Sequence, residues 1–174
     1  MTSLASLRND RGITLAEVLI AAAILSIGLA ALLSVVPVAS YAVQDGNQTS
    51  TATFLAQQRL EQVRNAAWND EGIDCIGLSP NVTSPPAPSG GICDRPPPVS
   101  DIDPTYPDEA TVPGFTQYAR TVRIIDCGVT PCEAVTSPTM RLVRVTVTYR
   151  PISAAGGSNS NTSVTLQWLV AQRL

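Results

Sequence analysis

The sequence contains no histidine and no lysine, and aromatic residues make up only 5% of its 174 positions. Without histidine the chain lacks the commonest general base, the Ser–His catalytic arrangement and the commonest zinc ligand. It also has no nucleophile beside a candidate base and no phosphate-binding loop. The formal net charge is −3, which is not the basic balance that nucleic acid attracts. We therefore expect no enzyme, no cofactor and no nucleic-acid partner.

Charge is also missing from a long stretch near the N-terminus. Residues 18–43 form a run of 26 positions without a charged side chain. As a helix this run spans roughly 39 Å, and the hydrocarbon core of a bilayer needs about 30 Å. Arg8 and Arg11 precede it, so the positive-inside rule places residues 1–12 in the cytoplasm and the C-terminal part outside. The run is too long for the apolar region of a secretory signal peptide.

One carboxylate, Glu17, stands at the start of this run. An acid near the centre of a membrane helix costs roughly 2.5 to 3.5 kcal/mol, and such acids are usually functional. From the residues alone two interpretations stay open. Glu17 either lies at the membrane interface and is simply solvated, or it serves a function inside the membrane.

The stretch RGITLAEVLIAAAILSIGLAALL resembles the N-terminus of the type IV pilin and pseudopilin superfamily, and is most similar to PilV-like minor pilins and to I-type minor pseudopilins. The resemblance implies that Gly12 ends a leader peptide and that Ile13 is the first mature residue, where the family usually has Phe. It implies cleavage after Gly12 and methylation of Ile13 by a prepilin peptidase. Glu17, the fifth mature residue, would then face an α-amine of its own or a neighbouring chain.

The resemblance also implies a function and a location. We expect a minor type IV pilin that is a single-pass inner-membrane protein before assembly and a pilus subunit at the cell surface afterwards, with other pilins as partners through its N-terminal helix. Two alternatives stay open. One is a minor pseudopilin of a type II secretion system, and the other is a membrane-tethered binding module, for a ligand or for DNA, that never polymerises.

Helical periodicity continues beyond the apolar run. Ala56, Leu60, Val63 and Ala67 fall on one face of a helix, and most of the polar side chains between them lie elsewhere. Pro37 predicts a kink, and Gly46 marks a weak point after which Thr51 or Thr53 could cap a new helix.

A proline-rich passage follows, since ten of the 14 prolines lie between Pro80 and Pro113. Such a passage forms neither a helix interior nor a central strand. Its acids lack the spacing of a calcium loop, so no metal is expected. The cysteines, all on one side of the apolar run, suggest disulfides in an oxidising compartment, although four cysteines allow three pairings. We favour the sequence-local pairs, Cys75 with Cys93 and Cys127 with Cys132.

The last third of the chain reads as β structure. In residues 139–151, Val143, Val145, Val147 and Tyr149 alternate with polar side chains, and residues 114–127 and 162–174 supply two further strands. The expected organisation is a leader at 1–12, a transmembrane or filament-core helix at 13–43, an amphipathic stalk helix at 44–70, a Pro-rich loop region at 71–114 and an antiparallel sheet at 115–174. The predicted fold class is α+β, pilin-like, with a long N-terminal helix packed on a small antiparallel β-sheet and loops stapled by disulfides.

Overall fold

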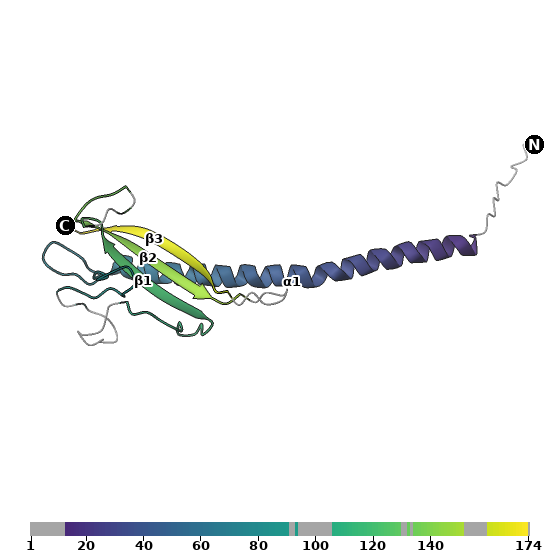
Figure 1. Ribbon diagram of the computed structural model, residues 1–174, viewed down its shortest axis with the longest axis horizontal. Coiled ribbons are helices and arrows are strands. Elements are labelled where there is room, and N and C mark those ends of the chain that lie inside the picture. Colours follow the sequence, from purple (N-terminus) through teal and green to yellow (C-terminus); the bar gives the residue numbers. More distant parts are fainter. Residues whose placement is uncertain are drawn as a thin grey trace, which may run out of the picture. The chain divides into compact units, whose positions relative to one another are not determined.

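The computed structural model has one helix and three strands in the part of the chain that it describes, residues 13–90, 93, 106–129, 132, 134–151 and 160–173. In chain order these are α1 (Leu15–Asn65), β1 (Tyr118–Asp126), β2 (Met140–Tyr149) and β3 (Thr162–Ala171) (Figure 1). The chain divides into two compact units, Met1–Ala42 and Val43–Leu174. This is the α+β, pilin-like fold class that the sequence predicts.

Helix α1 continues through Pro37, where the sequence predicts a kink, and through Gly46, where it predicts a weak point. Pro37 and Gly46 both lie inside α1, which stays helical from Leu15 to Asn65. The expectation of a new helix start at Thr51 or Thr53 is wrong, because each hydroxyl donates to a carbonyl four residues back, that of Asn47 or Thr49. These threonines therefore bond within a continuing helix.

The second unit holds the hydrophobic core. Its sheet has the order β1-β2-β3, both pairs are antiparallel, and the register places Val122 opposite Val145 and Val143 opposite Trp168. The sheet packs against the C-terminal part of α1, whose buried face consists of Gln48, Ala52, Leu55, Ala56, Arg59, Leu60 and Val63. The predicted stripe is thus right for three of its four residues. Ala67 lies beyond the end of the helix and is exposed.

Burial alternates along the two strands that α1 covers. Val143, Val145, Val147 and Tyr149 of β2 are buried, as the sequence pattern predicts. Strand β3 differs, because none of its residues is buried although its apolar side chains alternate in the same way. The indole of Trp168 in β3 is 48% exposed. The helix therefore covers β1 and β2 and leaves β3 largely open.

Two disulfides hold the loops of the second unit. The structure joins Cys75 to Cys93, 18 residues apart, and Cys127 to Cys132, five residues apart. These are the sequence-local pairs. Cys127 and Cys132 also pack with Leu142 in a small second hydrophobic cluster. The first bond joins two points of the loop region at 71–114, and the second closes the turn between β1 and β2.

Candidate functional site

The N-terminal segment is the first candidate site, and the structure describes it from Ile13 onward, so Gly12 lies outside the described residues. Ile13 is exposed and precedes the first turn of α1. Thr14 caps the helix, because its Oγ1 accepts the backbone N–H of Glu17 at 3.3 Å and its carbonyl accepts the N–H of Glu17 and Val18 at 3.0 and 3.2 Å. The first turn thus has an acceptor for its free backbone donors.

Thr14 and Glu17 together form the sequence pattern of a capping box, a Ser or Thr followed three residues later by Glu or Gln. The signal TLAE is visible in the sequence, although the expectations for Glu17 as a membrane carboxylate did not include the cap. A negative side chain in the first turn also interacts favourably with the positive end of the helix dipole. Glu17 therefore has a local role in starting α1, besides any role that it plays with a partner.

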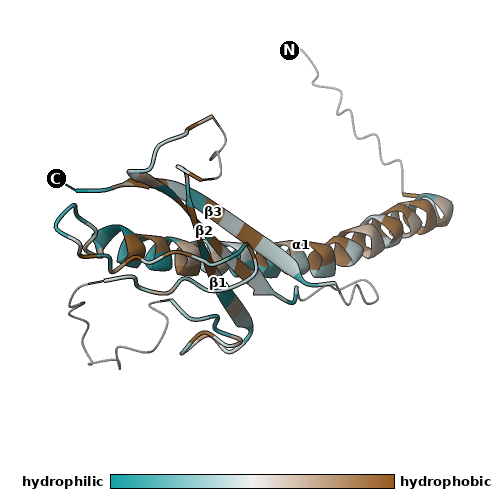
Figure 2. Cartoon of the chain, turned by 60° about the vertical axis from the view of Figure 1, so that its left-hand side comes forward, coloured by the Kyte–Doolittle hydropathy of each residue, from teal (hydrophilic) through white to brown (hydrophobic). Residues whose placement is uncertain are grey.

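No described residue covers the first part of α1. Every residue from Ile13 to Asn47 is exposed, including leucines, isoleucines and valines such as Leu19, Ile24 and Leu32. Figure 2 shows apolar residues almost without interruption along this part of the helix. Burying one such side chain contributes roughly 2 kcal/mol. So large an apolar surface calls for lipid or for protein around it, and α1 is long and apolar enough to cross a membrane.

The serine hydroxyls in this stretch are satisfied inside the helix. Ser26 donates to the carbonyl of Ala22 at 2.7 Å, Ser34 to that of Ala31 at 2.7 Å, and Ser40 to that of Val36 at 3.0 Å. A serine that bonds to the preceding turn presents no free donor to its surroundings. The exposed face of the helix is therefore apolar in practice as well as in composition.

The comparison with protein families identifies the same segment. The family described as the prokaryotic N-terminal methylation motif matches residues 7–33. Such a motif indicates a prepilin-processed protein of the type IV pilin or pseudopilin kind, and this family is structural rather than enzymatic. It implies processing by a prepilin peptidase and assembly with other pilins. No curated protein and no solved structure gives a significant match to the chain.

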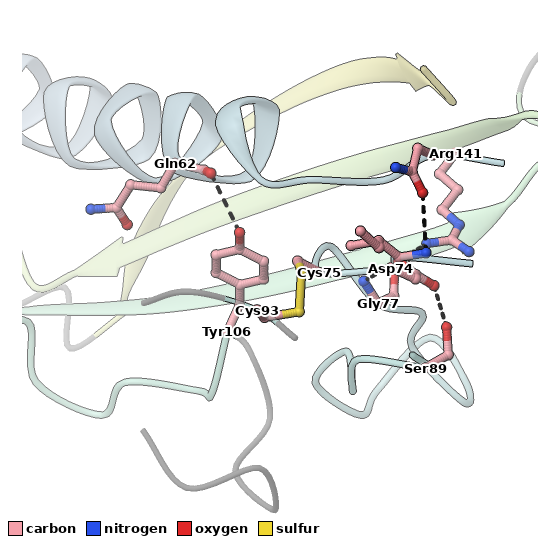
Figure 3. The surroundings of a disulfide bond; sticks show 10 residues. Gln62, Asp74, Cys75, Gly77, Ser89, Cys93, Tyr106 and Arg141 are labelled. Atoms are coloured by element: carbon pink, nitrogen blue, oxygen red, sulfur yellow. Dashed lines mark hydrogen bonds and ion pairs between the residues drawn. A yellow bond between two sulfur atoms is a disulfide. The ribbon is translucent and has the colours of Figure 1, made fainter. Parts of the chain in front are cut away.

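The second unit contains two buried ion-pair clusters that the sequence reasoning did not foresee. The first, which we call the Asp74 cluster, consists of Asp74, Ser89 and Arg141 (Figure 3). Nη1 of Arg141 donates to Oδ1 of Asp74 at 2.6 Å, and the Ser89 hydroxyl donates to the other oxygen. The backbone N–H of Gly77 adds a bond of 2.9 Å to Oδ1. Arg141 lies on β2, so this cluster ties the disulfide-bonded loop to the sheet.

The second cluster, which we call the Glu109 cluster, consists of Arg59 on α1, Arg120 on β1 and Glu109 in the loop between them. Both arginines form an ion pair with the one carboxylate, Arg120 through Nε at 2.7 Å. Nη1 of Arg120 also donates to the carbonyl of Leu55 on α1 at 3.1 Å. The cluster therefore joins the helix, the sheet and the loop at one point of the core.

The surroundings of the two carboxylates lower the pKa of both Asp74 and Glu109. Burial alone would raise the pKa of Asp74, but hydrogen bonds from Arg141, Ser89 and Gly77 outweigh it and lower the pKa below 3.8. Burial would also raise the pKa of Glu109, but the hydrogen bonds and positive charges of Arg120 and Arg59 outweigh burial and lower this pKa below 4.5. Both carboxylates are therefore held in the charged form.

Charged side chains on strands and in loops are ordinarily solvated, and these clusters depart from that rule. Arg120 and Arg141 are only 5% and 8% exposed. Asp74 is buried as well, and Asp108 holds Arg123 through two bonds of 2.6 and 2.8 Å. The missed signal was the strand period, which places Arg141 on the same face as Val143 and Arg120 on the same face as Val122.

The described residues contain no group of three or more carboxylate, cysteine or histidine side chains placed to hold a metal ion. The acids that pair with arginines have their oxygens occupied, so they serve the fold. The part of the chain that the structure describes thus offers two kinds of feature: an uncovered apolar helix with the processing motif at its start, and a loop-bearing domain fixed by disulfides and buried ion pairs.

Proposed function

We propose that this chain is a minor type IV pilin, a structural and assembly subunit that prepilin peptidase cuts after Gly12. The observation that carries the proposal is the coincidence of the methylation motif at residues 7–33 with the uncovered apolar surface of α1 that begins at Ile13. A helix of this kind is stable in a bilayer as an anchor before assembly and among other helices afterwards. The protein would lie in the inner membrane with its C-terminal domain outside the cytoplasm, and then in the pilus.

In this proposal Gly12, Ile13 and Glu17 act in sequence. Cleavage after Gly12 frees the α-amine of Ile13, which the peptidase methylates. The carboxylate of Glu17, in the first turn of α1, then pairs with such an ammonium when α1 leaves the lipid headgroups for the filament. A carboxylate out of water needs a partner of opposite charge, and the uncut chain has no amine at that place. The leader peptide would thereby keep the subunit from assembling too early.

The finer assignment, a minor pilin of the PilV-like kind, rests on the similarity of TLAEVLIAAAILSIGL to that group. The second unit supports a specialised subunit, because its loops are stapled by two disulfides and anchored by two buried ion-pair clusters. Loops fixed in this way present a defined surface, which a subunit at the tip of a filament requires. The same features would suit a minor pseudopilin, so the experiment must identify the filament.

The test is mass spectrometry of the N-terminus of the protein taken from pili sheared off the cell surface. We expect an N-terminal Ile13 that carries one methyl group. An intact Met1, or a cut after Ala39, would contradict processing. A processed chain that is found only with secretion-system filaments would identify a pseudopilin. A chain that stays in the membrane and never enters a filament would identify a tethered binding module.

A further inference from the structure

The sequence contains three Asn-X-Ser/Thr triplets without a middle proline, the pattern that marks an acceptor for N-glycosylation. They begin at Asn47, Asn81 and Asn161. In such a triplet the side-chain nitrogen of the asparagine receives the sugar, and the hydroxyl two residues later assists. Because so short a pattern also occurs by chance, the conformation that the fold gives each triplet decides which of them can act.

The triplet at Asn47 is held inside helix α1. The Thr49 hydroxyl donates to the carbonyl of Asp45 at 3.0 Å and shares a hydrogen bond of 2.8 Å with the Tyr149 hydroxyl. This hydroxyl is therefore committed to the helix and the sheet, and it does not reach the Asn47 side chain.

The triplet at Asn161 runs into strand β3. Its hydroxyl residue, Ser163, is the second residue of that strand. Residues two positions apart in an extended chain lie roughly 7 Å from each other, which is beyond hydrogen-bonding distance. The hydroxyl of Ser163 therefore does not assist the side chain of Asn161 while β3 is paired with β2.

The triplet at Asn81 is bent, so that its hydroxyl lies against its asparagine. Oδ1 of Asn81 accepts three hydrogen bonds, from the Thr83 hydroxyl at 2.7 Å and from the backbone N–H groups of Thr83 and Ser84 at 2.9 and 2.8 Å. Asn81 and Thr83 are exposed, and no described residue bonds to Nδ2 of Asn81. The oxygen of this carboxamide is thus held by the chain, while its nitrogen is open to a reactant.

The bent triplet stands on a loop that the second unit fixes in place. Leu78 and Ala87 close the loop with two backbone hydrogen bonds of 3.1 Å. Arg123 of β1 donates to the carbonyl of Thr83 at 2.6 Å and so ties the loop to the sheet. Val82, the middle residue of the triplet, is 70% exposed. An enzyme can therefore reach this triplet without unfolding the domain.

We propose that Asn81 is a glycosylation site, at which Nδ2 receives a sugar from a lipid-linked glycosyl diphosphate. A C–N bond forms between Nδ2 and the anomeric carbon of the sugar, and the bond from that carbon to the diphosphate oxygen breaks. The lipid diphosphate leaves with the electron pair, and a base of the transferring enzyme takes one proton from Nδ2. The inference rests on the proposed function in one respect, namely that the second unit lies outside the cytoplasm, on the same side of the membrane as the donor.

The three hydrogen bonds to Oδ1 favour this transfer. The nitrogen of a carboxamide is a poor nucleophile, because its electron pair is delocalised onto the oxygen. When Nδ2 gives up a proton, negative charge collects on Oδ1, and donors at 2.7 to 2.9 Å stabilise that charge as an oxyanion hole does. Two of these donors belong to the backbone, so the Thr83 hydroxyl is the one that a substitution can remove.

The test is peptide mapping by mass spectrometry of the full chain isolated from the cells that produce it naturally. We expect a glycan on the side chain of Asn81, and no modification at Asn47 or Asn161. Removing one donor of an oxyanion hole slows a reaction by roughly 100-fold or more, so Thr83→Val should leave Asn81 almost unmodified. Thr83→Ser is the matched control, because it keeps the hydroxyl and should keep the glycan.

Three results would overturn the proposal: an unmodified Asn81 in the wild type, a glycan that persists in Thr83→Val, or equal modification of Asn161. Thermal unfolding checks that each variant is folded. The same map covers the N-terminus and so separates this proposal from the proposed function. A methylated Ile13 with an unmodified Asn81 overturns the glycosylation site alone, whereas a glycan on Asn81 with an intact Met1 overturns the processing alone.

Discussion

The guanidinium of Arg141 lies 4.1 Å from the centroid of the Trp68 ring, between the indole and the carboxylate of Asp74 to which it is bonded. A planar cation stacked on an aromatic ring and paired at its edge is held from two directions. Trp68 follows α1 and Asp74 begins the disulfide-bonded loop, so a single side chain from β2 connects both to the sheet. Arg141 therefore links three separate parts of the second unit.

Removing the carboxylate from this arrangement should be costly. Asp74→Ala leaves the buried guanidinium of Arg141 without its counter-charge, and we expect the free energy of unfolding to fall by about 3 kcal/mol. The matched control is Asp70→Ala, because Asp70 is exposed, and it should change stability by less than about 0.5 kcal/mol. Chemical denaturation of the full-length protein measures both. Equal effects at the two positions would show that the Asp74 cluster does not stabilise the fold.

Acid should weaken the second unit through the same carboxylates. The pKa values of Asp74 and Glu109 are lowered below 3.8 and 4.5, so the stability that they contribute is fully present above those values. It is lost as the pH falls through the lowered pKa values of the folded state, because the folded protein then has to take up protons that break the ion pairs.

Thermal unfolding between pH 7 and pH 2 follows this loss. Replacing Asp74 by Asn and Glu109 by Gln should lower stability at pH 7 and flatten the acid part of the profile. Glu61→Gln is the control, since Glu61 forms only an exposed pair with Arg64, and it should leave the profile as steep as in the wild type. A profile that keeps its slope in the double variant would assign acid sensitivity to other groups.

The two disulfides should contribute unequally to stability. The loop closed by Cys75 and Cys93 spans 18 residues, and that closed by Cys127 and Cys132 spans five. Loop-closure entropy then predicts losses of about 3 and about 2 kcal/mol when each pair is replaced by alanine. Denaturant titrations of the two double variants make the comparison. A larger loss from the short loop would mean that packing of Cys127 and Cys132 against Leu142 outweighs chain entropy.

The local and the intermolecular roles of Glu17 can be separated by two substitutions. Glu17→Gln keeps a side chain that suits a capping box but removes the charge, and it should sharply reduce the amount of this subunit in sheared pili. Thr14→Ala removes the cap, costs about 1 kcal/mol of helix stability, and should leave incorporation near the wild-type level. Cleavage after Gly12 should proceed in both variants. If the two substitutions impair incorporation equally, Glu17 acts only through the start of the helix.

The sequence predicted the sheet well because alternation in β2 is clean. From Val143 onward valines alternate with polar residues, and the two-residue period then allows only one face of the strand to be buried. The face of α1 was predicted from Ala56, Leu60 and Val63 for the corresponding reason. Short loop lengths, for their part, favoured the two cysteine pairs that the structure contains.

What the sequence did not predict depends on partners far away in the chain. Gly46 and its polar neighbours weaken a helix locally, but Tyr149 bonds to Thr49 and the core covers Gln48 and Ala52, so packing keeps α1 continuous. Arg120 and Arg141 look like surface residues until Glu109 and Asp74 are found beside them. Such pairs bring together residues 11 and 67 positions apart, and no local pattern encodes them.

The hydrogen bonds of the three serines in the apolar part of α1 affect how easily this helix can move between lipid and neighbouring protein. Ser26, Ser34 and Ser40 return their hydroxyls to the helix's own carbonyls, so none of these hydrogen bonds needs a lipid headgroup, a water molecule or a neighbouring protein. Serine hydroxyls that are bonded in this way can move from one apolar solvent to another without breaking and remaking hydrogen bonds. The hydrogen bonds of these three hydroxyls therefore add almost nothing to the free energy of moving the helix between lipid and protein. The direction of that transfer depends on the other contacts that the helix makes in each environment.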